Sequence, residues 1–353
     1  MAVPKIYYDG TKDEWVVVHN ETDSGAICFG DCTGSSGNCT GSLPCGDTGV
    51  FGGGGLNGYS TIYNTIDYIT ISTPSNAQDF GDLTIARREF AATSNGTNDR
   101  GVFGGGSTNT SAWDGYDVNT IDYITISSPG NAQDFGDLTI ARDGLTATSN
   151  GTNNRGVFGG GDKNLNSYVK TIDYITILTP SNAQNFGNLT VAKEHLAATS
   201  NGTNNRGVFG GGWDNNKIFS TIDYITISTP SNATNFGDLT VARHHLAATS
   251  NATKDRGVFG GGFNSGNNIS TIDYITISTP GNAQNFGNLS VARDGLTATS
   301  NGINDRGVFG GGGGANGNIF STIDYITISS LGNAQNFGNL TGSRGLLAST
   351  SNA

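Results

Sequence analysis

Short hydrophobic stretches recur along this chain at nearly constant spacing, and each mixes β-branched or aromatic residues with polar ones. TIDYITI begins at positions 65, 120, 171, 221, 271 and 322, and RGVFGGG begins at 100, 155, 206, 256 and 306, with the variant TGVFGGG at 48. Runs of this length, separated by Gly-, Pro- and Asn-rich turns, predict β-strands. No stretch keeps a helical period, so we expect an all-β fold.

One repeat of about fifty residues contains four predicted strands. They are a small Thr-rich strand such as LTATSN (145–150), the GVFGG strand, the TIDYITI strand and a strand around FGDLTI. Four strands in this length match one blade of a β-propeller, whereas a β-solenoid coil needs fewer residues. In the first TIDYITI, Ile66 and Tyr68 lie in one alternation phase and Ile69 and Ile71 in the other. A strand covered on both faces by neighbouring blades has this pattern.

The two ends of the repeat array are incomplete in complementary ways. The first GVFGGG has no Thr-rich strand before it, and the last Thr-rich strand, in RGLLASTSNA, has nothing after it. We therefore predict that residues 344–351 complete the blade begun by residues 49–84. Residues 49–353 would then form a closed ring of six four-stranded blades, and ring closure removes exposed strand edges that could act as aggregation templates. Residues 1–48 form a separate N-terminal cap or anchor in this prediction.

The order of an Arg-led small strand, a turn, an apolar strand ending in Gly-Gly and a Tyr-bearing strand resembles the Kelch repeat of β-propellers. The resemblance covers about residues 49–353. The Trp that follows the Tyr strand in Kelch repeats is missing here. We expect its packing role to fall to the Phe of DFGDL or NFGNL, at Phe80, Phe135, Phe186, Phe236, Phe286 and Phe337.

Repeats of the YITI…NAQDFGDLTVAR…RGVFGGG type are also similar to repeats in virion proteins of bacteriophages, notably those of aquatic cyanobacteria. This resemblance implies a tail, fibre or capsid-surface protein. It also implies that the chain is made in the host cytoplasm and resides in the extracellular virion, where other virion proteins are its partners.

The copies differ from one another in two segments. One is the loop after the triple glycine, and the other is the residue pair after the basic residue that opens each Thr-rich strand. Both connections emerge on the same face of a four-stranded blade, so one face is predicted to carry nearly all the diversity and the binding residues.

The candidate ligand-binding residues on that face are loop aromatics without an apolar counterpart in the other copies, together with an adjacent histidine pair. They are Tyr59, Trp113, Tyr116, Tyr168, Trp213, Phe263, His244 and His245. Aromatic rings beside amides and carboxylates suit sugars, whose apolar faces stack while their hydroxyls form hydrogen bonds. The alternative is that these aromatics only pin their own loops.

The sequence offers little catalytic or metal-binding chemistry. Neighbouring side chains of a strand point to opposite faces, so we expect that His244 and His245 cannot serve one metal site. The glycine runs precede loops rather than helices, which argues against phosphate binding. Asp residues of QDFGD could bind calcium, but their replacement by Asn in QNFGN favours a turn role. We therefore predict a non-enzymatic protein with no cofactor and no metal.

A basic residue opens each Thr-rich strand, at Arg87, Arg142, Lys193, Arg243, Arg293 and Arg344. These residues could line the axis as an anion site. Because the same residue recurs in every copy, we favour a structural ion pair or carbonyl contact within its own blade.

The charge balance restricts the partners. A formal net charge of −11 argues against binding to nucleic acid or to anionic membranes. No apolar run is long enough to span a bilayer, so we expect no membrane insertion. The strict register of the apolar runs argues against disorder despite 55 glycines.

All four cysteines lie in the N-terminal segment, at Cys28, Cys32, Cys39 and Cys45. Two disulfides are the first expectation, with a zinc site or free thiols as alternatives. The start lacks the apolar region of a secretory signal. A virion protein that matures after lysis would reconcile cytoplasmic synthesis with disulfides.

The opening KIYYDGTKDEWVVV predicts a hairpin around Asp9-Gly10 and resembles short openings of phage structural proteins. We expect this segment either to dock the propeller onto other virion proteins or to cap it.

The leading functional expectation is a non-enzymatic phage virion protein whose variable face binds a host-surface glycan or receptor. The alternative is a structural decoration or adaptor protein that mediates protein–protein assembly in the particle. A propeller enzyme acting on polysaccharide is a third, weaker interpretation.

Overall fold

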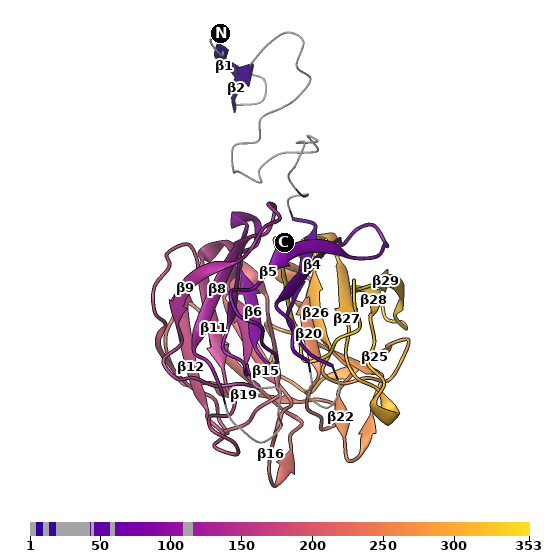
Figure 1. Ribbon diagram of the computed structural model, residues 1–353. Helices are drawn as coiled ribbons and strands as arrows, with labels where there is room; N and C mark the ends of the chain where they lie inside the picture. Colours follow the sequence, from indigo (N-terminus) through magenta and orange to yellow (C-terminus); the bar gives the residue numbers. More distant parts are fainter. Residues whose placement is uncertain (1–4, 10–13, 19–42, 44–45, 57–60, 109–115) are drawn as a thin grey trace.

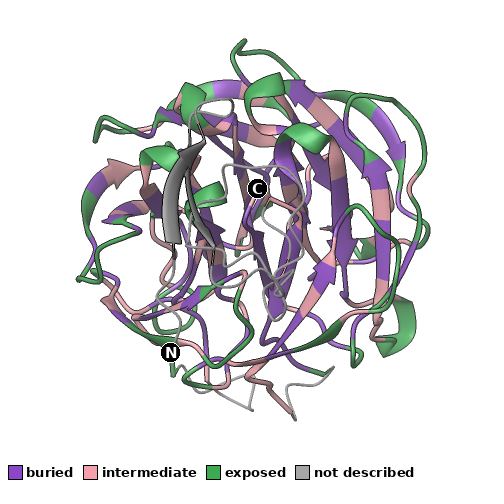
Figure 2. Cartoon of the chain, turned by 90° about the horizontal axis from the view of Figure 1, so that it is seen from above, coloured by how far each residue is buried: buried purple, intermediate pink, exposed green. Residues whose placement is uncertain are grey.

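The computed structural model describes residues 5–9, 14–18, 43, 46–56, 61–108 and 116–353. In this part of the chain, six antiparallel four-stranded sheets surround a central axis as the blades of a propeller (Figures 1 and 2). The predicted six-bladed all-β propeller is confirmed.

The blades share one strand order, in which the first strand of each lies innermost and contacts the first strands of its neighbours. Blade 1 contains β30 (Ala348–Ser351), β3 (Thr48–Gly52), β4 (Thr65–Thr70) and β5 (Gln78–Asp82); blade 2 contains β6 (Ala91–Ser94), β7 (Arg100–Gly104), β8 (Thr120–Thr125) and β9 (Gln133–Asp137); blade 3 contains β10 (Thr146–Ser149), β11 (Arg155–Gly159), β12 (Thr171–Thr176) and β13 (Gln184–Asn188). Blade 4 contains β14 (Ala197–Ser200), β15 (Arg206–Gly210), β18 (Thr221–Thr226) and β19 (Thr234–Asp238); blade 5 contains β20 (Ala247–Ser250), β21 (Arg256–Gly260), β24 (Thr271–Thr276) and β25 (Gln284–Asn288); blade 6 contains β26 (Thr297–Ser300), β27 (Arg306–Gly310), β28 (Thr322–Thr327) and β29 (Gln335–Asn339).

Blade 1 closes the ring as predicted. Its innermost strand, β30, comes from the end of the chain and pairs antiparallel with β3, with Gly49 opposite Ser351. Asn352 then fastens the junction: its side-chain oxygen accepts a 3.0 Å hydrogen bond from the backbone N–H of Thr48, and its own N–H donates to the Thr48 carbonyl.

The hydrophobic cores lie between adjacent blades. Between blades 6 and 1, for example, Val308 and Ile323 pack with Phe51, Ile69 and Ile71, all at most 2% exposed. Ile66 of the same strand as Ile69 belongs to the next core, against blade 2. The strand is therefore covered on both faces, as its double-phase pattern predicts. Because each core joins two blades, closing the ring completes the last core.

The Phe residues predicted to replace the Kelch Trp are buried beside the Tyr strand. Phe135 is 2% exposed, and its ring centroid lies 6.1 Å from that of Tyr123 in a T-shaped arrangement. The other five copies repeat this pair, in Phe80, Phe186, Phe236, Phe286 and Phe337.

The glycine-rich phrase allows the blades to approach closely. A Cβ on Gly210 would lie 2.7 Å from the buried ring of Phe259 in the next blade, which is closer than real contacts allow. The following Gly211 has a φ of 71°, a left-handed conformation that disfavours other residues. The phrase thus makes room for the neighbouring Phe and then turns the chain out of the strand.

A buried ion pair explains the basic residue that opens each innermost strand. Arg243 Nη2 lies 3.0 Å from Oδ2 of Asp273, the Asp of TIDYITI in the same blade, and both side chains are fully buried. The Asp273 carboxylate also accepts a 2.6 Å hydrogen bond from Thr240 Oγ1. The expectation of an ion pair within the blade is confirmed for all six copies, through Asp122, Asp173, Asp223, Asp273, Asp324 and Asp67, although Lys193 lies 4.0 Å from Asp223.

One end of the propeller, here called the uniform face, carries the turns between first and second strands, η2 (Gly96–Asn98), η3 (Gly151–Asn153), η4 (Gly202–Asn204), η5 (Ala252–Lys254) and η6 (Gly302–Asn304). The Asn before each turn donates its side-chain N–H to the residue that precedes the second strand of the next blade; Asn201 Nδ2, for example, donates to Asp255 Oδ1 at 2.9 Å. The equivalent donors are Asn95, Asn150, Asn251, Asn301 and Asn352. A closed circle of six side-chain bonds therefore joins the blades at this face.

The N-terminal segment contains β1 (Lys5–Asp9) and β2 (Glu14–Val18), which pair antiparallel as the predicted hairpin. The four candidate disulfide residues Cys28, Cys32, Cys39 and Cys45 lie outside the described residues. Among the described residues, no helix is long and apolar enough to cross a membrane.

Candidate functional site

The two segments that differ among the copies meet at the opposite end of the propeller, which we call the variable face. Each residue pair forms a β-bridge to the loop after the triple glycine of its own blade, as Glu194 does with Trp213 and His244 with Phe263. In blades 4 and 5 these loops form the hairpins β16 (Trp213–Asp214)–β17 (Lys217–Ile218) and β22 (Phe263–Asn264)–β23 (Asn267–Asn268), which project away from the C-terminus (Figure 1). The prediction of one diverse face is confirmed.

The second residue of each variable pair belongs to a hydrogen-bonded ring around the axis. The backbone N–H of each one donates to the carbonyl of its neighbour over 2.7–2.9 Å, and the circle closes through Glu89, Gly144, His195, His245, Gly295 and Leu346. All six have a φ between 52° and 60°. We call this the axial ring; with the innermost strands it lines a cavity of about 120 Å³.

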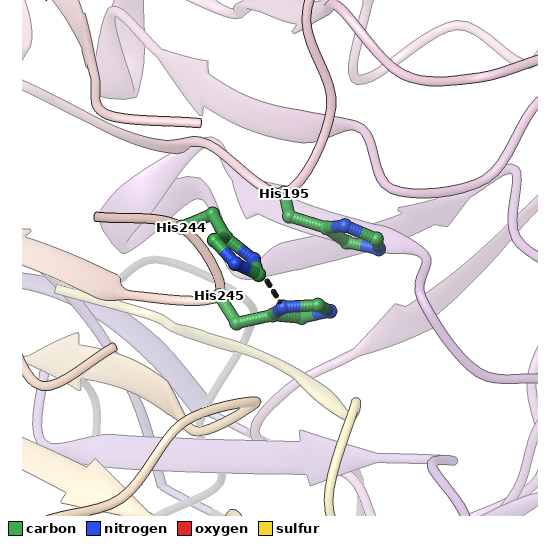
Figure 3. A group of neighbouring side chains, drawn as sticks. All are labelled: His195, His244 and His245. Atoms are coloured by element: carbon green, nitrogen blue, oxygen red, sulfur yellow. Dashed lines mark hydrogen bonds between the residues drawn. The ribbon is translucent and has the colours of Figure 1, made fainter. Parts of the chain in front are cut away.

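Three histidines converge where the axial ring meets the hairpin of blade 4 (Figure 3). The rings of His195 and His245 stack with centroids 3.6 Å apart, and Nδ1 of His245 lies 2.7 Å from Nδ1 of His244. One nitrogen from each ring lies within 4.8 Å of the others. Among the described residues, this is the one group of His, Cys, Asp or Glu side chains that could hold a metal ion.

The expectation that His244 and His245 cannot face one site is wrong. It assumed a strand, in which successive side chains alternate. His245 instead has a φ of 52° and belongs to the axial ring, while the strand β20 begins only at Ala247. The left-handed residue turns the backbone between the two side chains, so both rings reach the same side.

Carboxylates flank His195. Its Nε2 lies 3.5 Å from Glu89 Oε2, and its Nδ1 lies 3.5 Å from Glu194 Oε1. Burial opposes a charge on His195, but the negative Glu194 and Glu89 raise its pKa above the ordinary value. Burial likewise opposes ionisation of Glu89, yet the hydrogen bond and charge of His195 lower the pKa of Glu89 to about 2. The two carboxylates therefore favour the protonated, positively charged form of the His195 ring that lies between them.

The other two histidines are neutral at pH 7. Burial, followed by the positive charge of His195, lowers the pKa of His244 to about 4. The same causes, with a contribution from His244, lower the pKa of His245 well below its ordinary value. In the hydrogen bond between their Nδ1 atoms, one ring donates its N–H and the other accepts with its lone pair, so the donating ring keeps its lone pair on Nε2.

Trp213 connects the histidines to the loops. Its Nε1 lies 3.1 Å from His195 Nδ1 and its hydrogen bond also reaches Glu194. An indole N–H only donates, so it bonds His195 when that ring is neutral and Glu194 when the ring is protonated. Trp213 therefore has an acceptor for its N–H in either charge state of His195.

Four aromatic side chains form a continuous row across blades 3, 4 and 5. Tyr168 packs edge-on against Trp213 with centroids 6.1 Å apart, Trp213 stacks on His244 at 5.5 Å, and His244 packs edge-on against Phe263 at 5.5 Å. The Tyr168 hydroxyl donates to Asn215 Oδ1 at 2.8 Å in the next loop. We call Tyr168, Trp213, His244 and Phe263 the aromatic row.

The sequence-predicted site residues fall into three groups. Tyr168, Trp213, Phe263, His244 and His245 come together, whereas Tyr116 lies in the blade 2 loop with 65% of its surface exposed. Tyr59 and Trp113 lie outside the described residues. Sequence reasoning did not assign His195, Glu89 and Glu194, although all three belong to the variable pairs, and that variability was the signal that could have found them.

Comparisons with known proteins add no relative: no protein-family model matches the chain, and no curated protein matches it.

Proposed function

We propose that this chain is a non-enzymatic phage virion protein, of the tail, fibre or capsid surface, whose variable face binds a glycan or receptor of the host surface. The aromatic row carries the proposal. The positions that hold Trp213 and Phe263 in blades 4 and 5 are occupied by Ser107 and Gly313 in blades 2 and 6. The propeller therefore forms without an aromatic ring at this position. Half-buried rings beside amides such as Asn215 offer stacking surfaces and hydrogen bonds to a sugar.

The point at which the chain enters the propeller supports a binding role for the variable face. The segment before β3 enters the propeller at the uniform face, where Asp47 accepts a hydrogen bond from Asn301. A docking contact made by residues 1–48 would then leave the variable face directed away from the particle. The virion assignment itself is drawn from the likeness of the repeats to phage virion repeats.

The alternative is a structural adaptor that docks through the uniform face. Three exposed apolar residues interrupt the repeat there: Leu178 and Leu331, 47% and 59% exposed, in turns after the third strand, and Ile303, 60% exposed, in η6. The other copies carry Ser, Pro or Thr at these positions. These side chains offer apolar contact to another protein.

Binding to a glycan array and to intact candidate host cells tests the proposal. Trp213→Ala should weaken binding about tenfold, because an aromatic contact contributes about 1–2 kcal/mol. Ile303→Thr restores the repeat residue on the uniform face and should leave binding unchanged. Equal binding by the parent, Trp213→Ala and Ile303→Thr contradicts the glycan-binding function. A parent that binds neither glycans nor cells but assembles with other particle proteins, and loses that assembly in Ile303→Thr, supports the adaptor.

A further inference from the structure

We propose that His195, His244 and His245 form a binding site for one divalent transition-metal cation of the zinc class, at the axial opening of the variable face. The site does not depend on the proposed glycan-binding function, because a cation can bind there whatever the face contacts. The argument starts from the donor atoms.

The spacing of the donor nitrogens is close to that of a zinc site. Zn–N distances of about 2.0–2.1 Å in a tetrahedron place ligand nitrogens about 3.3 Å apart. The three nitrogens here lie within 4.8 Å of one another. The 2.7 Å contact between the Nδ1 atoms of His244 and His245 is a hydrogen bond, which a cation bound to both nitrogens would replace. Rotation of the rings about their last torsion, which is soft, brings the lone pairs of the stacked His195 and His245 toward a common point.

Each possible donor of His195 has a carboxylate on its other side. If Nδ1 binds the cation, Trp213 exchanges its hydrogen bond to that nitrogen for its bond to Glu194, and Nε2 faces Glu89 at 3.5 Å. If Nε2 binds the cation, Nδ1 faces Glu194 at 3.5 Å and keeps the bond from Trp213. A carboxylate that accepts the second ring proton is the usual partner of a metal-bound histidine. The unused carboxylate, or water, is available as a fourth ligand, so the site matches the three-histidine sets that imidazole-binding metals prefer.

The His195 Nε2 atom is buried, and its contact with Glu89 Oε2, at 3.5 Å, is longer than an ordinary hydrogen bond. Coordination to a cation would give this nitrogen a stronger partner.

The propeller does not require histidine at these positions. Two other blades carry Asp143-Gly144 and Asp294-Gly295 at the positions equivalent to His244-His245. These pairs form the same β-bridge and contribute to the same axial ring. Three of the four histidines in the chain nevertheless occur here, two of them in a left-handed conformation that glycine adopts more easily. The scaffold therefore leaves this cluster unexplained.

Zinc titration by calorimetry on the full-length chain tests the site. The four cysteines are changed to serine in every protein used, because thiolates also bind zinc. The protein that keeps all histidines should bind one zinc ion per chain. His195→Gly and His245→Gly should each weaken binding at least about tenfold, because each removes a ligand.

Leu346→Gly is the matched control, since it changes an axial-ring residue of the same backbone conformation and keeps the histidines. It should bind zinc as the parent does, and circular dichroism should show that all variants are folded. Failure of the parent to bind zinc, nickel or copper overturns the proposal. So does zinc binding that is equally strong in the parent and in both histidine variants.

Discussion

The uniform and variable faces both join the six blades by a closed circle of hydrogen bonds, but they use different atoms. At the uniform face the bonds come from Asn side chains, such as Asn201 to Asp255. At the variable face they come from the backbone of the axial ring, such as His245 N–H to the His195 carbonyl. A side-chain bond fixes the residue type, whereas a backbone bond leaves the side chain free. The repeats are therefore nearly identical at one face and diverse at the other.

The largest effect is expected from opening the ring. Deleting residues 344–353 removes β30 and leaves the edge of β3 exposed. It also removes Leu347 from the core between blades 6 and 1 and so opens that core to solvent. We expect loss of more than about 5 kcal/mol, enough to abolish cooperative unfolding. Chemical denaturation followed by circular dichroism measures it.

Fusing residues 344–353 ahead of residue 46 is the control for that deletion, because it supplies the same strand from the other side. This permuted chain should refold. A deleted chain that unfolds as cooperatively as the parent would show that closure contributes little.

Removing one partner of a buried ion pair should cause the next largest loss in the free energy of unfolding. Asp273→Ala leaves Arg243 buried without its carboxylate and should cost about 3–5 kcal/mol. The same change at Asp223 should cost less, since Lys193 lies 4.0 Å away. Urea midpoints of the two variants give the comparison, and equal losses would mean that pair geometry is unimportant.

The Asn circle of the uniform face should contribute less. Asn201→Ala removes the bond to Asp255 and the acceptor of the Arg206 N–H, and should cost about 1–3 kcal/mol. Ligand binding should not change. Weaker binding with unchanged stability would place the site on the uniform face.

The smallest effect is expected in the axial ring. His245→Gly keeps the backbone bonds, and relief of the left-handed conformation offsets the lost packing, so stability should change by no more than about 1 kcal/mol. Thermal unfolding without metal measures it. A loss of several kcal/mol would show that the side chain, not the backbone, holds this face together.

The sequence was sufficient for most of the fold because the repeats supply the same information six times. The double-phase TIDYITI strand, the incomplete ends and the segregation of differences specified blades, closure and a single diverse face. The role of the TIDYITI Asp, such as Asp273, was not predicted, because its partner Arg243 lies thirty residues away in another part of the blade.

The site was less predictable because it depends on backbone conformation. His244 and His245 were assigned alternating directions, which fails where the chain turns left-handed at His245. His195 comes from another blade, and its approach to His245 depends on the curvature of the whole ring. Composition alone does not show that three histidines meet.

The central claim is that one face of an otherwise uniform propeller recognises the ligand. Hydrogen–deuterium exchange tests this claim most directly, when it is measured with and without the glycan or receptor fragment that the binding assays identify. We expect slower exchange in residues 162–170, 194–195, 213–220, 244–245 and 263–270, with no change in the turns η2 to η6. Protection of the η turns with unaltered exchange in those loops would contradict it.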